Sequence, residues 1–123
     1  MTVISNTTVL SNFASIYQLD VLRQLFGTIY ISTEVYEEIQ HGLDENYEFY
    51  NVIEGLIRPP NQSGWLAMTS MVDDQEINLF SQMPARLHRG ETSCIAIAKR
   101  RDWLLLTDDR AAREYAIKLD IHI

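Results

Sequence analysis

The sequence predicts an α/β fold in which helices cover both faces of a central parallel sheet, giving three layers. Short β-branched or apolar runs alternate along the chain with longer segments of helical periodicity, which is typical of parallel strands joined by crossover helices. The run "WLLLT", residues 103–107, is apolar almost throughout, as a strand covered on both faces is. The chain has 123 residues, of which 46% are hydrophobic, so we expect residues 1–123 to form one domain with its own core.

The first elements are two strands, each followed by helix. Residues 2–5, "TVIS", are β-branched and predict a strand. Capping residues and then helical spacing follow in "NTTVLSNFASI", and residues 19–26 place their leucines and a phenylalanine on one helical face. Gly27 is expected to end that helix. The run "TIYIS", residues 28–32, predicts the second strand.

The middle of the chain is less regular. The segment "STEVYEEIQHG" begins with Ser32 or Thr33 as a helix cap and is expected to end at Gly42. Residues 44–57 indicate an acidic, aromatic helix, in which residues 47–50 favour core packing over an interface with another protein. A loop at residues 59–64 precedes a short strand, "WLAMT", and a helix in "DDQEINLFSQM" that Pro84 ends.

The last third carries the clearest pattern. Residues 90–100, "GETSCIAIAKR", form a helix of small residues suited to close packing, and the strand at 103–107 follows. A helix in "DRAAREYAIKL" leads to "IHI", which begins like a strand. Because the sequence stops at Ile123 as this run begins, one reading is that the sheet lacks a C-terminal strand.

Charge and cysteine content exclude several classes of protein. The formal net charge is −7, which argues against a general DNA-coating protein. Eight of the ten basic residues nevertheless lie between Arg86 and Lys118, forming either a basic strip or ordinary solvated helix faces. Cys94 is the only cysteine, lies in an apolar pattern and is expected to be buried. With no disulfide, signal segment or apolar run of membrane length, we expect a cytoplasmic protein without membrane contact.

Polar residues follow two of the predicted strands, where a parallel sheet places its binding sites. Asn6 ends the first strand, and Asp108 and Asp109 end the strand at 103–107. Glu91 lies in the first turn of the small-residue helix. Several carboxylates together favour Mg²⁺ or Mn²⁺, which prefer oxygen ligands. The sequence contains no zinc-binding pattern, phosphate-binding loop or nucleophile elbow.

Each acid also has a purely structural explanation. Asp108 is placed to cap the last helix, and Glu91 suits the positive end of a helix dipole. Of Glu34, Glu37 and Glu38, at least two are expected to be solvated only. The metal-site hypothesis therefore rests on these acids lying together in the fold.

Three segments resemble the PIN-domain family, in particular its compact prokaryotic branch related to VapC-type toxins. They are "VISNTTVLSNF", "ISTEVYEEI" and "RGETSCIAIAKRRDWLLLTDDRAAREYA". The third is the most specific, and residues 44–85 match little. The resemblance implies an α/β/α sandwich and a Mg²⁺- or Mn²⁺-dependent ribonuclease acting on single-stranded RNA. It carries catalytic positions onto Glu38, Glu91 and Asp109, with Asp108 as an additional acid of this branch.

Asn6 departs from the family pattern, which has Asp at this position. An amide offers one neutral oxygen where a carboxylate offers two that share a charge, so metal affinity and activation of water are expected to fall without being abolished. The predicted metal ligands are Asn6, Glu91, Asp109 and Asp108. Thr107 and Thr8 are predicted to support these ligands by hydrogen bonding.

The remaining expectations concern partners. Arg110, Arg89 and Arg86 are predicted to hold flanking RNA phosphates, with ordinary surface ion pairs as the alternative. A homodimer and a partner antitoxin that inserts a peptide into the acidic pocket are further expectations. A non-catalytic module that binds RNA or protein is the competing hypothesis.

Overall fold

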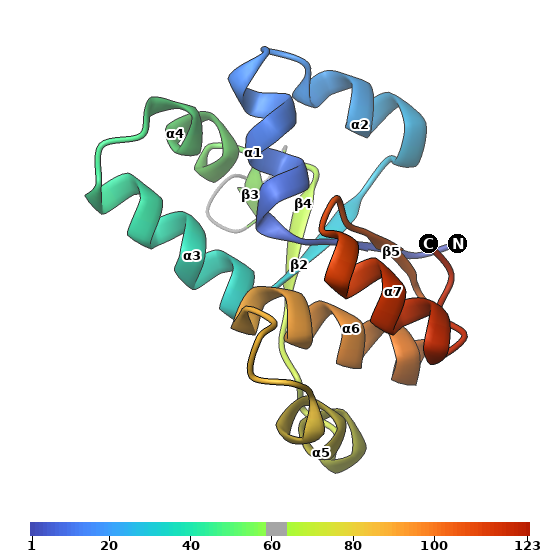
Figure 1. Cartoon of the computed structure of the whole chain (residues 1–123). Coiled ribbons are helices and arrows are strands. Elements are labelled where there is room, and N and C mark those ends of the chain that lie inside the picture. Colours follow the sequence, from blue (N-terminus) through green and yellow to red (C-terminus); the bar gives the residue numbers. More distant parts are fainter. Residues whose placement is uncertain (59–63) are drawn as a thin grey trace.

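A computed structural model describes residues 1–58 and 64–123; the predicted loop at 59–64 thus lies almost entirely outside the described residues. Within these ranges, parallel strands form a five-stranded sheet of order β3-β4-β2-β1-β5. This confirms the predicted fold class (Figure 1). The strands are β1 (Val3–Ser5), β2 (Ile29–Ser32), β3 (Ile57–Arg58), β4 (Leu66–Thr69) and β5 (Leu104–Leu106).

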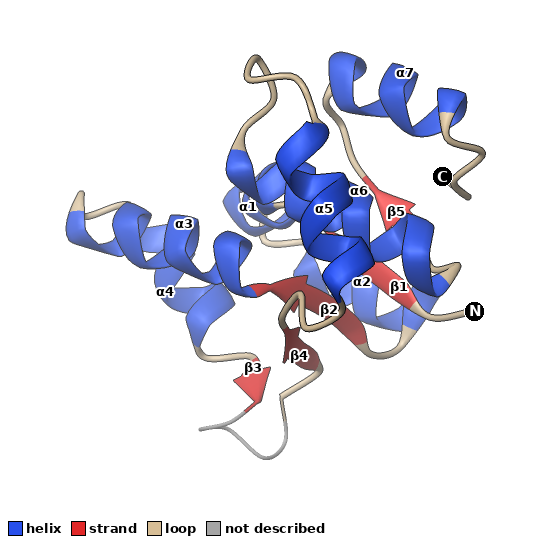
Figure 2. Cartoon of the chain, turned by 90° about the horizontal axis from the view of Figure 1, so that it is seen from below, coloured by secondary structure: helices blue, strands red, loops and turns tan. Residues whose placement is uncertain are grey.

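Helices cover both faces of this sheet. In Figure 1, α1 and α2 lie above the strands and α5 and α6 lie below them, and Figure 2 shows β3 at one edge of the sheet with α7 beyond β5 at the other. The helix α6 packs against β1, β2 and β5. The helices are α1 (Thr7–Ser15), α2 (Leu19–Phe26), α3 (Thr33–Asp44), α4 (Glu48–Glu54), α5 (Asp74–Gln82), α6 (Arg89–Arg101) and α7 (Arg110–Lys118).

The small-residue helix α6 packs closely in the core, and its close packing was predicted. Every residue from Gly90 to Ala98 is buried. Cys94 is fully buried and its thiol donates to the backbone carbonyl of Ser5 at 3.4 Å. Burial raises the pKa of the Cys94 thiol far above its ordinary value, so the prediction of a small buried side chain is confirmed.

Two boundaries in the middle of the chain were predicted wrongly. The helix α3 continues through Gly42 to Asp44. A β-carbon at Gly42 would overlap the ring of Tyr50, so this glycine lets α4 approach α3 and does not end the helix. The predicted helix over 44–57 is confined to Glu48–Glu54, because Ile57 pairs with Leu66 in the sheet.

The aromatic segment 47–50 joins this packing. Phe49 and Tyr50 lie half-buried against the core, with ring centroids 4.7 Å apart, which agrees with the expected core role. Tyr47 remains 50% exposed. Among the described residues, no helix has the length and apolar character that crossing a membrane requires.

The edge strand β5 also differs from expectation. Only Leu105 is fully buried, and Leu104 and Leu106 are half-buried, so β5 is well covered on one face and partly on the other. The segment after α7 is not a strand, contrary to prediction. The amide of Leu105 nevertheless donates to the carbonyl of His122 at 2.8 Å, so this segment runs beside β5.

A buried ion pair connects α6 to α5 and β4. Glu76 on α5 is 2% exposed, and its carboxylate accepts from Arg101 Nε at 2.6 Å. Arg101 also donates to Thr69 Oγ1 at 2.7 Å and lies over the ring of Trp103, 4.9 Å from its centroid. Burial acts to raise the pKa of Glu76, but the hydrogen bonds and charge of Arg101 lower it overall.

Arg101→Met is expected to destabilise the protein by about 3 kcal/mol, because it leaves the Glu76 carboxylate buried without a charged partner. Arg100→Met is the matched control, since Arg100 is exposed on the same helix; its effect should stay within about 0.5 kcal/mol. Urea unfolding at pH 7 measures both changes. Equal losses in the two variants would contradict a structural role for this ion pair.

Candidate functional site

The site lies at the edge of the sheet where β1 and β5 end. The chain runs from β1 to strands on one side of it, whereas β5 lies on its other side. Such a switch in strand order leaves a crevice beyond the carboxyl ends of the two strands. Asn6 and Thr107 follow these strands directly, and α6 begins beside them with Glu91 in its first turn.

The side chain of Asn6 lies between the acids and is 1% exposed. Its nitrogen Nδ2 donates to Glu91 Oε1 at 2.7 Å, to Thr107 Oγ1 at 3.1 Å and, more weakly, to Asp108 Oδ1 at 3.4 Å. Its oxygen Oδ1 accepts from the backbone amide of Val9 at 3.0 Å and so caps α1. Both ends of the amide are therefore occupied.

Thr107 connects the acids through its hydroxyl group. The hydroxyl donates to Glu91 Oε2 at 3.3 Å and accepts from the backbone amide of Asp109 at 3.1 Å. The predicted supporting role of Thr107 has a matching geometry here. Thr8 differs: it is exposed, and its backbone carbonyl accepts from Ser11 Oγ at 3.1 Å, away from the acids.

The two aspartates divide the roles expected of them. Asp109, not Asp108, caps the last helix, because its Oδ2 accepts from the amide of Ala112 at 2.7 Å. The structural explanation proposed for Asp108 is therefore wrong. Asp108 is exposed and its Oδ2 accepts from Asn12 Nδ2 at 2.6 Å.

The acids lie close enough together to affect the pKa of Glu91. Burial raises this pKa most, and the negative charges of Asp109 and Asp108 raise it further. Hydrogen bonds from Asn6 and Thr107 act in the opposite direction but do not cancel the rise. Glu91 and both aspartates therefore share one region of negative potential.

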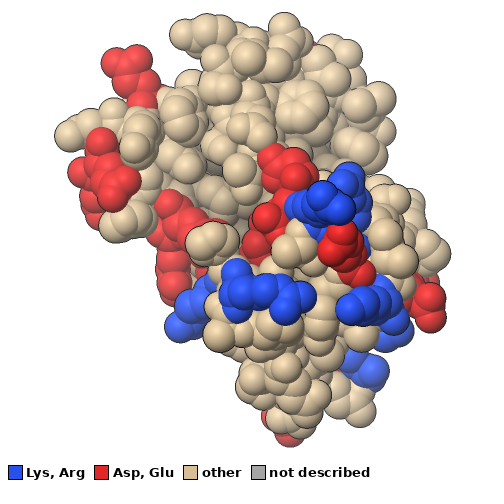
Figure 3. Space-filling model, viewed as in Figure 1, with Lys and Arg blue, Asp and Glu red and all other residues tan. Residues whose placement is uncertain are grey.

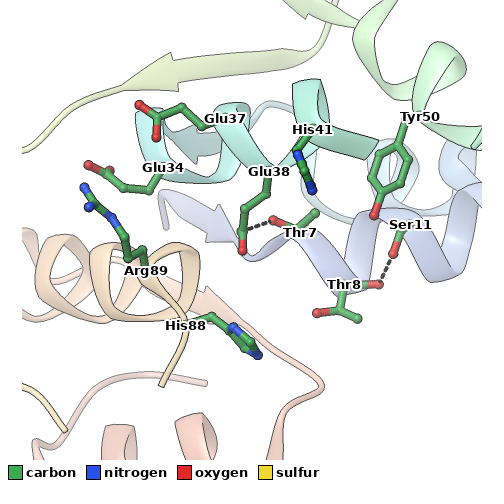
Figure 4. Close-up of a pocket in the computed structure, with 10 residues that line it drawn as sticks. All are labelled: Thr7, Thr8, Ser11, Glu34, Glu37, Glu38, His41, Tyr50, His88 and Arg89. Atoms are coloured by element: carbon green, nitrogen blue, oxygen red, sulfur yellow. Dashed lines mark hydrogen bonds between the residues drawn. The ribbon is translucent and has the colours of Figure 1, made fainter. Parts of the chain in front are cut away.

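Glu38 approaches the same edge from α3 but faces a neighbouring cleft. Its Oε1 accepts from Thr7 Oγ1 at 2.5 Å, and no β-carbon would fit at Gly90 without overlapping its carboxylate. The cleft has a volume of about 570 Å³. Figure 4 shows Glu38 and Thr7 at its centre, between the other residues that line it. These are Thr8, Ser11, Glu34, Glu37, His41, Tyr50, His88 and Arg89.

Basic side chains lie to one side of this edge, over α6 and α7, as Figure 3 shows. Arg89 and Arg86 are exposed, and Arg89 lines the cleft while its guanidinium lies 5.8 Å from the centroid of the Phe80 ring. Arg110 pairs with Glu114 at 3.1 Å on the surface of α7. That pair is exposed on both sides, so it holds Arg110 only weakly.

The carboxylates and Asn6 differ in their fit to a metal ion. Glu91, Asp108 and Asp109 supply the oxygen donors that Mg²⁺ and Mn²⁺ prefer. Asn6 presents its nitrogen to them, and an amide nitrogen bearing two hydrogens offers no lone pair for a metal. Within residues 1–58 and 64–123, no group of three or more His, Cys, Asp or Glu side chains is arranged to hold a metal ion.

Sequence reasoning missed three residues at this site. Thr7 holds Glu38, Asn12 contacts Asp108, and Gly90 leaves room for the Glu38 carboxylate. Thr7 and Gly90 are next to the predicted site residues Asn6 and Glu91 in the sequence. That proximity was the one signal that could have placed them at the site. No pattern in the sequence indicates that Asn12 reaches Asp108.

Gly90→Ala is expected to be less stable than its control by about 1 kcal/mol, because the added methyl group forces the end of the flexible Glu38 side chain away from Thr7. Gly55→Ala is the matched control, since a β-carbon there meets only backbone carbonyls at 3.6 Å. Thermal unfolding of both variants measures the difference. If Gly90→Ala unfolds at the wild-type temperature, the close packing of Glu38 against α6 is not a constraint.

Glu91→Gln is expected to stabilise the metal-free protein at pH 7, with a gain that grows as the pH rises from about 4.5. A carboxyl whose folded pKa is raised binds more protons in the folded state than in the unfolded state, so stability falls as pH rises from the unfolded pKa to the folded one. The glutamine removes this loss while keeping an acceptor for Asn6.

Glu76→Gln provides the opposite control. Its folded pKa is lowered, so the glutamine should destabilise the protein above the unfolded pKa and lose this effect as the pH falls through the folded pKa. Urea unfolding in EDTA between pH 4 and pH 8 measures both trends. Parallel pH profiles for the two variants would show that Glu91 is not held in a region of negative potential.

Comparison with known proteins agrees with this geometry. A family model described as a PIN domain matches residues 2–123. No curated protein matches the chain. PIN domains are a nuclease-type fold that generally uses divalent metal ions. Since the match covers nearly the whole sequence, the chain belongs to the PIN-domain family.

Proposed function

We propose that the chain is a divalent-metal-dependent endoribonuclease that acts on single-stranded RNA. The observation that supports this best is the meeting of Glu91, Asp108 and Asp109 at one edge of the sheet. These acids come from segments far apart in the sequence, and a carboxylate buried near two like charges, as Glu91 is, is typical of a functional site.

The metal would be held by Glu91, Asp109 and Asp108, with Asn6 and Glu38 beside it. Bound Mg²⁺ or Mn²⁺ supplies a water of lowered pKa and offsets negative charge at the phosphate. The side chains of the protein orient these ligands. Thr107 fixes one oxygen of Glu91, and the cap on α7 uses one oxygen of Asp109, so the cap does not use the other.

The neighbouring cleft is suited to the RNA strand. Arg89 and His88 offer donors for phosphate on one side of it, and Tyr50 and His41 offer rings on the other. Single-stranded nucleic acid is bound by this combination of positive charge and aromatic surface. Glu34 and Glu37 line the same cleft, and their negative charges oppose the binding of phosphate. RNA binding there therefore depends on the positive charge of Arg89 and of a bound metal ion.

The proposal extends to a VapC-like toxin with a protein antitoxin, on the resemblance of residues 89–116 to that branch. A homodimer or antitoxin contact is proposed for α4, where Tyr47 and Val52 are 50% and 51% exposed. A basic segment of an antitoxin would complement the acids of the site.

A non-catalytic module is the second candidate function, and the orientation of Asn6 favours it. An amide nitrogen already satisfies Glu91 and Asp108, so the fold needs no metal to hold these two acids. Such a module would bind RNA or a protein partner through the same cleft without cutting the RNA.

A cleavage assay with fluorescent single-stranded RNA distinguishes the nuclease from the non-catalytic module. The assay uses about 5 mM Mn²⁺, enough to fill a weak carboxylate site. Glu91→Gln and Asp109→Asn should each lower the rate by about 100-fold, because each removes one ligand charge. Asparagine retains the cap on α7, which alanine would remove.

Asp20→Asn is the control for loss of a charge, since Asp20 is exposed on α2 and accepts from Gln24 Nε2 at 2.7 Å. This variant should cleave RNA at the wild-type rate. RNA that binds without being cut, equally in all variants, would support the non-catalytic module. Cleavage unaffected by either site variant would show that a contaminating nuclease is responsible.

A further inference from the structure

Asn6 occupies the place in the acid cluster where a cation would be expected. Its Nδ2 lies within hydrogen-bonding distance of two carboxylates and a hydroxyl, with the shortest contact, to Glu91 Oε1, at 2.7 Å. The N–H bonds of an amide carry partial positive charge, so this nitrogen attracts both acids without adding a full charge.

The orientation of this amide is determined by its surroundings. Exchanging Oδ1 and Nδ2 would place an oxygen 2.7 Å from Glu91 Oε1 and an N–H group against the backbone amide of Val9. The first contact joins two acceptors and the second joins two donors, so both hydrogen bonds would be lost. Because Asn6 is 1% exposed, water does not replace them.

We propose that the side-chain amide of Asn6 is an internal substitute for the divalent cation, holding Glu91 and Asp108 together in the metal-free protein. Asn6 is then a positioning residue and not a metal ligand. A divalent ion competes with this amide for the same carboxylate oxygens, so the protein folds fully without metal and binds metal weakly. This inference concerns the metal site of the proposed nuclease and rests on that part of the proposed function.

Asn12 provides a matched comparison on the same helix. Each asparagine donates to one oxygen of Asp108, Asn6 to Oδ1 at 3.4 Å and Asn12 to Oδ2 at 2.6 Å. Asn12 is exposed and does not contact Glu91 in the described structure. Replacing either residue by Asp adds one negative charge near Asp108, but only the change at position 6 places that charge, buried, against Glu91.

The test compares wild type, Asn6→Asp and Asn12→Asp by thermal unfolding in EDTA and during titration with MnCl2. Without metal, Asn6→Asp should unfold about 4 °C or more below Asn12→Asp, because it replaces a donor by a third acceptor among acids. With Mn²⁺, Asn6→Asp should reach half-saturation at a concentration on the order of tenfold lower than wild type, since a full negative charge now faces the ion. Asn12→Asp should change both measurements much less than Asn6→Asp does, because its added charge lies exposed beside Asp108 and not buried against Glu91.

A double variant keeps the test informative if Asn6→Asp folds poorly. In Asn6→Asp with Glu91→Gln, the glutamine amide supplies a donor and removes one charge, so the metal-free unfolding temperature should return toward wild type. Damage to the fold from any other cause would not be reversed in this way. Folding of Asn6→Asp only after Mn²⁺ is added also supports the proposal.

Equal Mn²⁺ affinity of wild type and Asn6→Asp would overturn the inference, as would equal metal-free stability. The proposed function is tested by a different measurement, the cleavage of RNA, so it can fail independently of this inference. If Asn6→Asp binds Mn²⁺ more tightly but neither protein cleaves single-stranded RNA, the role of Asn6 stands and the nuclease proposal falls. If wild type cleaves RNA with the same Mn²⁺ requirement as Asn6→Asp, the nuclease proposal stands and the role of Asn6 falls.

Discussion

The site and the adjacent fold depend on the hydrogen bonds of one side chain, the buried amide of Asn6. Its oxygen caps α1 and its nitrogen binds Glu91 on α6 and Thr107 after β5. Three segments distant in sequence are therefore joined by one buried amide. Loss of the bond to Val9 or to Glu91 would leave a buried oxygen without the hydrogen bond it has here, and such a loss costs more than the bond itself contributes.

This arrangement allows an acidic site to exist in a stable fold. Burial and two nearby aspartates raise the pKa of Glu91, which is the usual signature of a functional carboxylate. The core beneath Glu91 does not stabilise its negative charge, because α6 is buried from Gly90 to Ala98 among small and apolar residues. Rigid packing of α6 therefore positions Glu91, and Asn6 with Thr107 limits the cost of its charge.

Most of the fold was predictable because short stretches of sequence identify its strands and helices. The β-branched run of β2 and the small residues of α6 each indicate one structure without reference to distant parts of the chain. Errors arose where tertiary packing decided the outcome. Gly42 looks like the end of a helix in the sequence, but it lets the ring of Tyr50 pack against α3. Ile57 continues a helical pattern in the sequence, but it pairs with β4 in the sheet. Such choices depend on partners that no local pattern contains.

The site could be predicted as a set of residues but not as a set of contacts. Parallel topology alone brings Asn6 and Asp109 to one edge of the sheet. Which aspartate caps α7 and which way the amide of Asn6 faces are decided by single hydrogen bonds. The second choice carries the chemistry: with its oxygen inward Asn6 would be a metal ligand, and with its nitrogen inward it takes the place of the metal. The cap on α1 selects the second arrangement, so the hydrogen bond that begins this helix also determines which atom of Asn6 faces the acids.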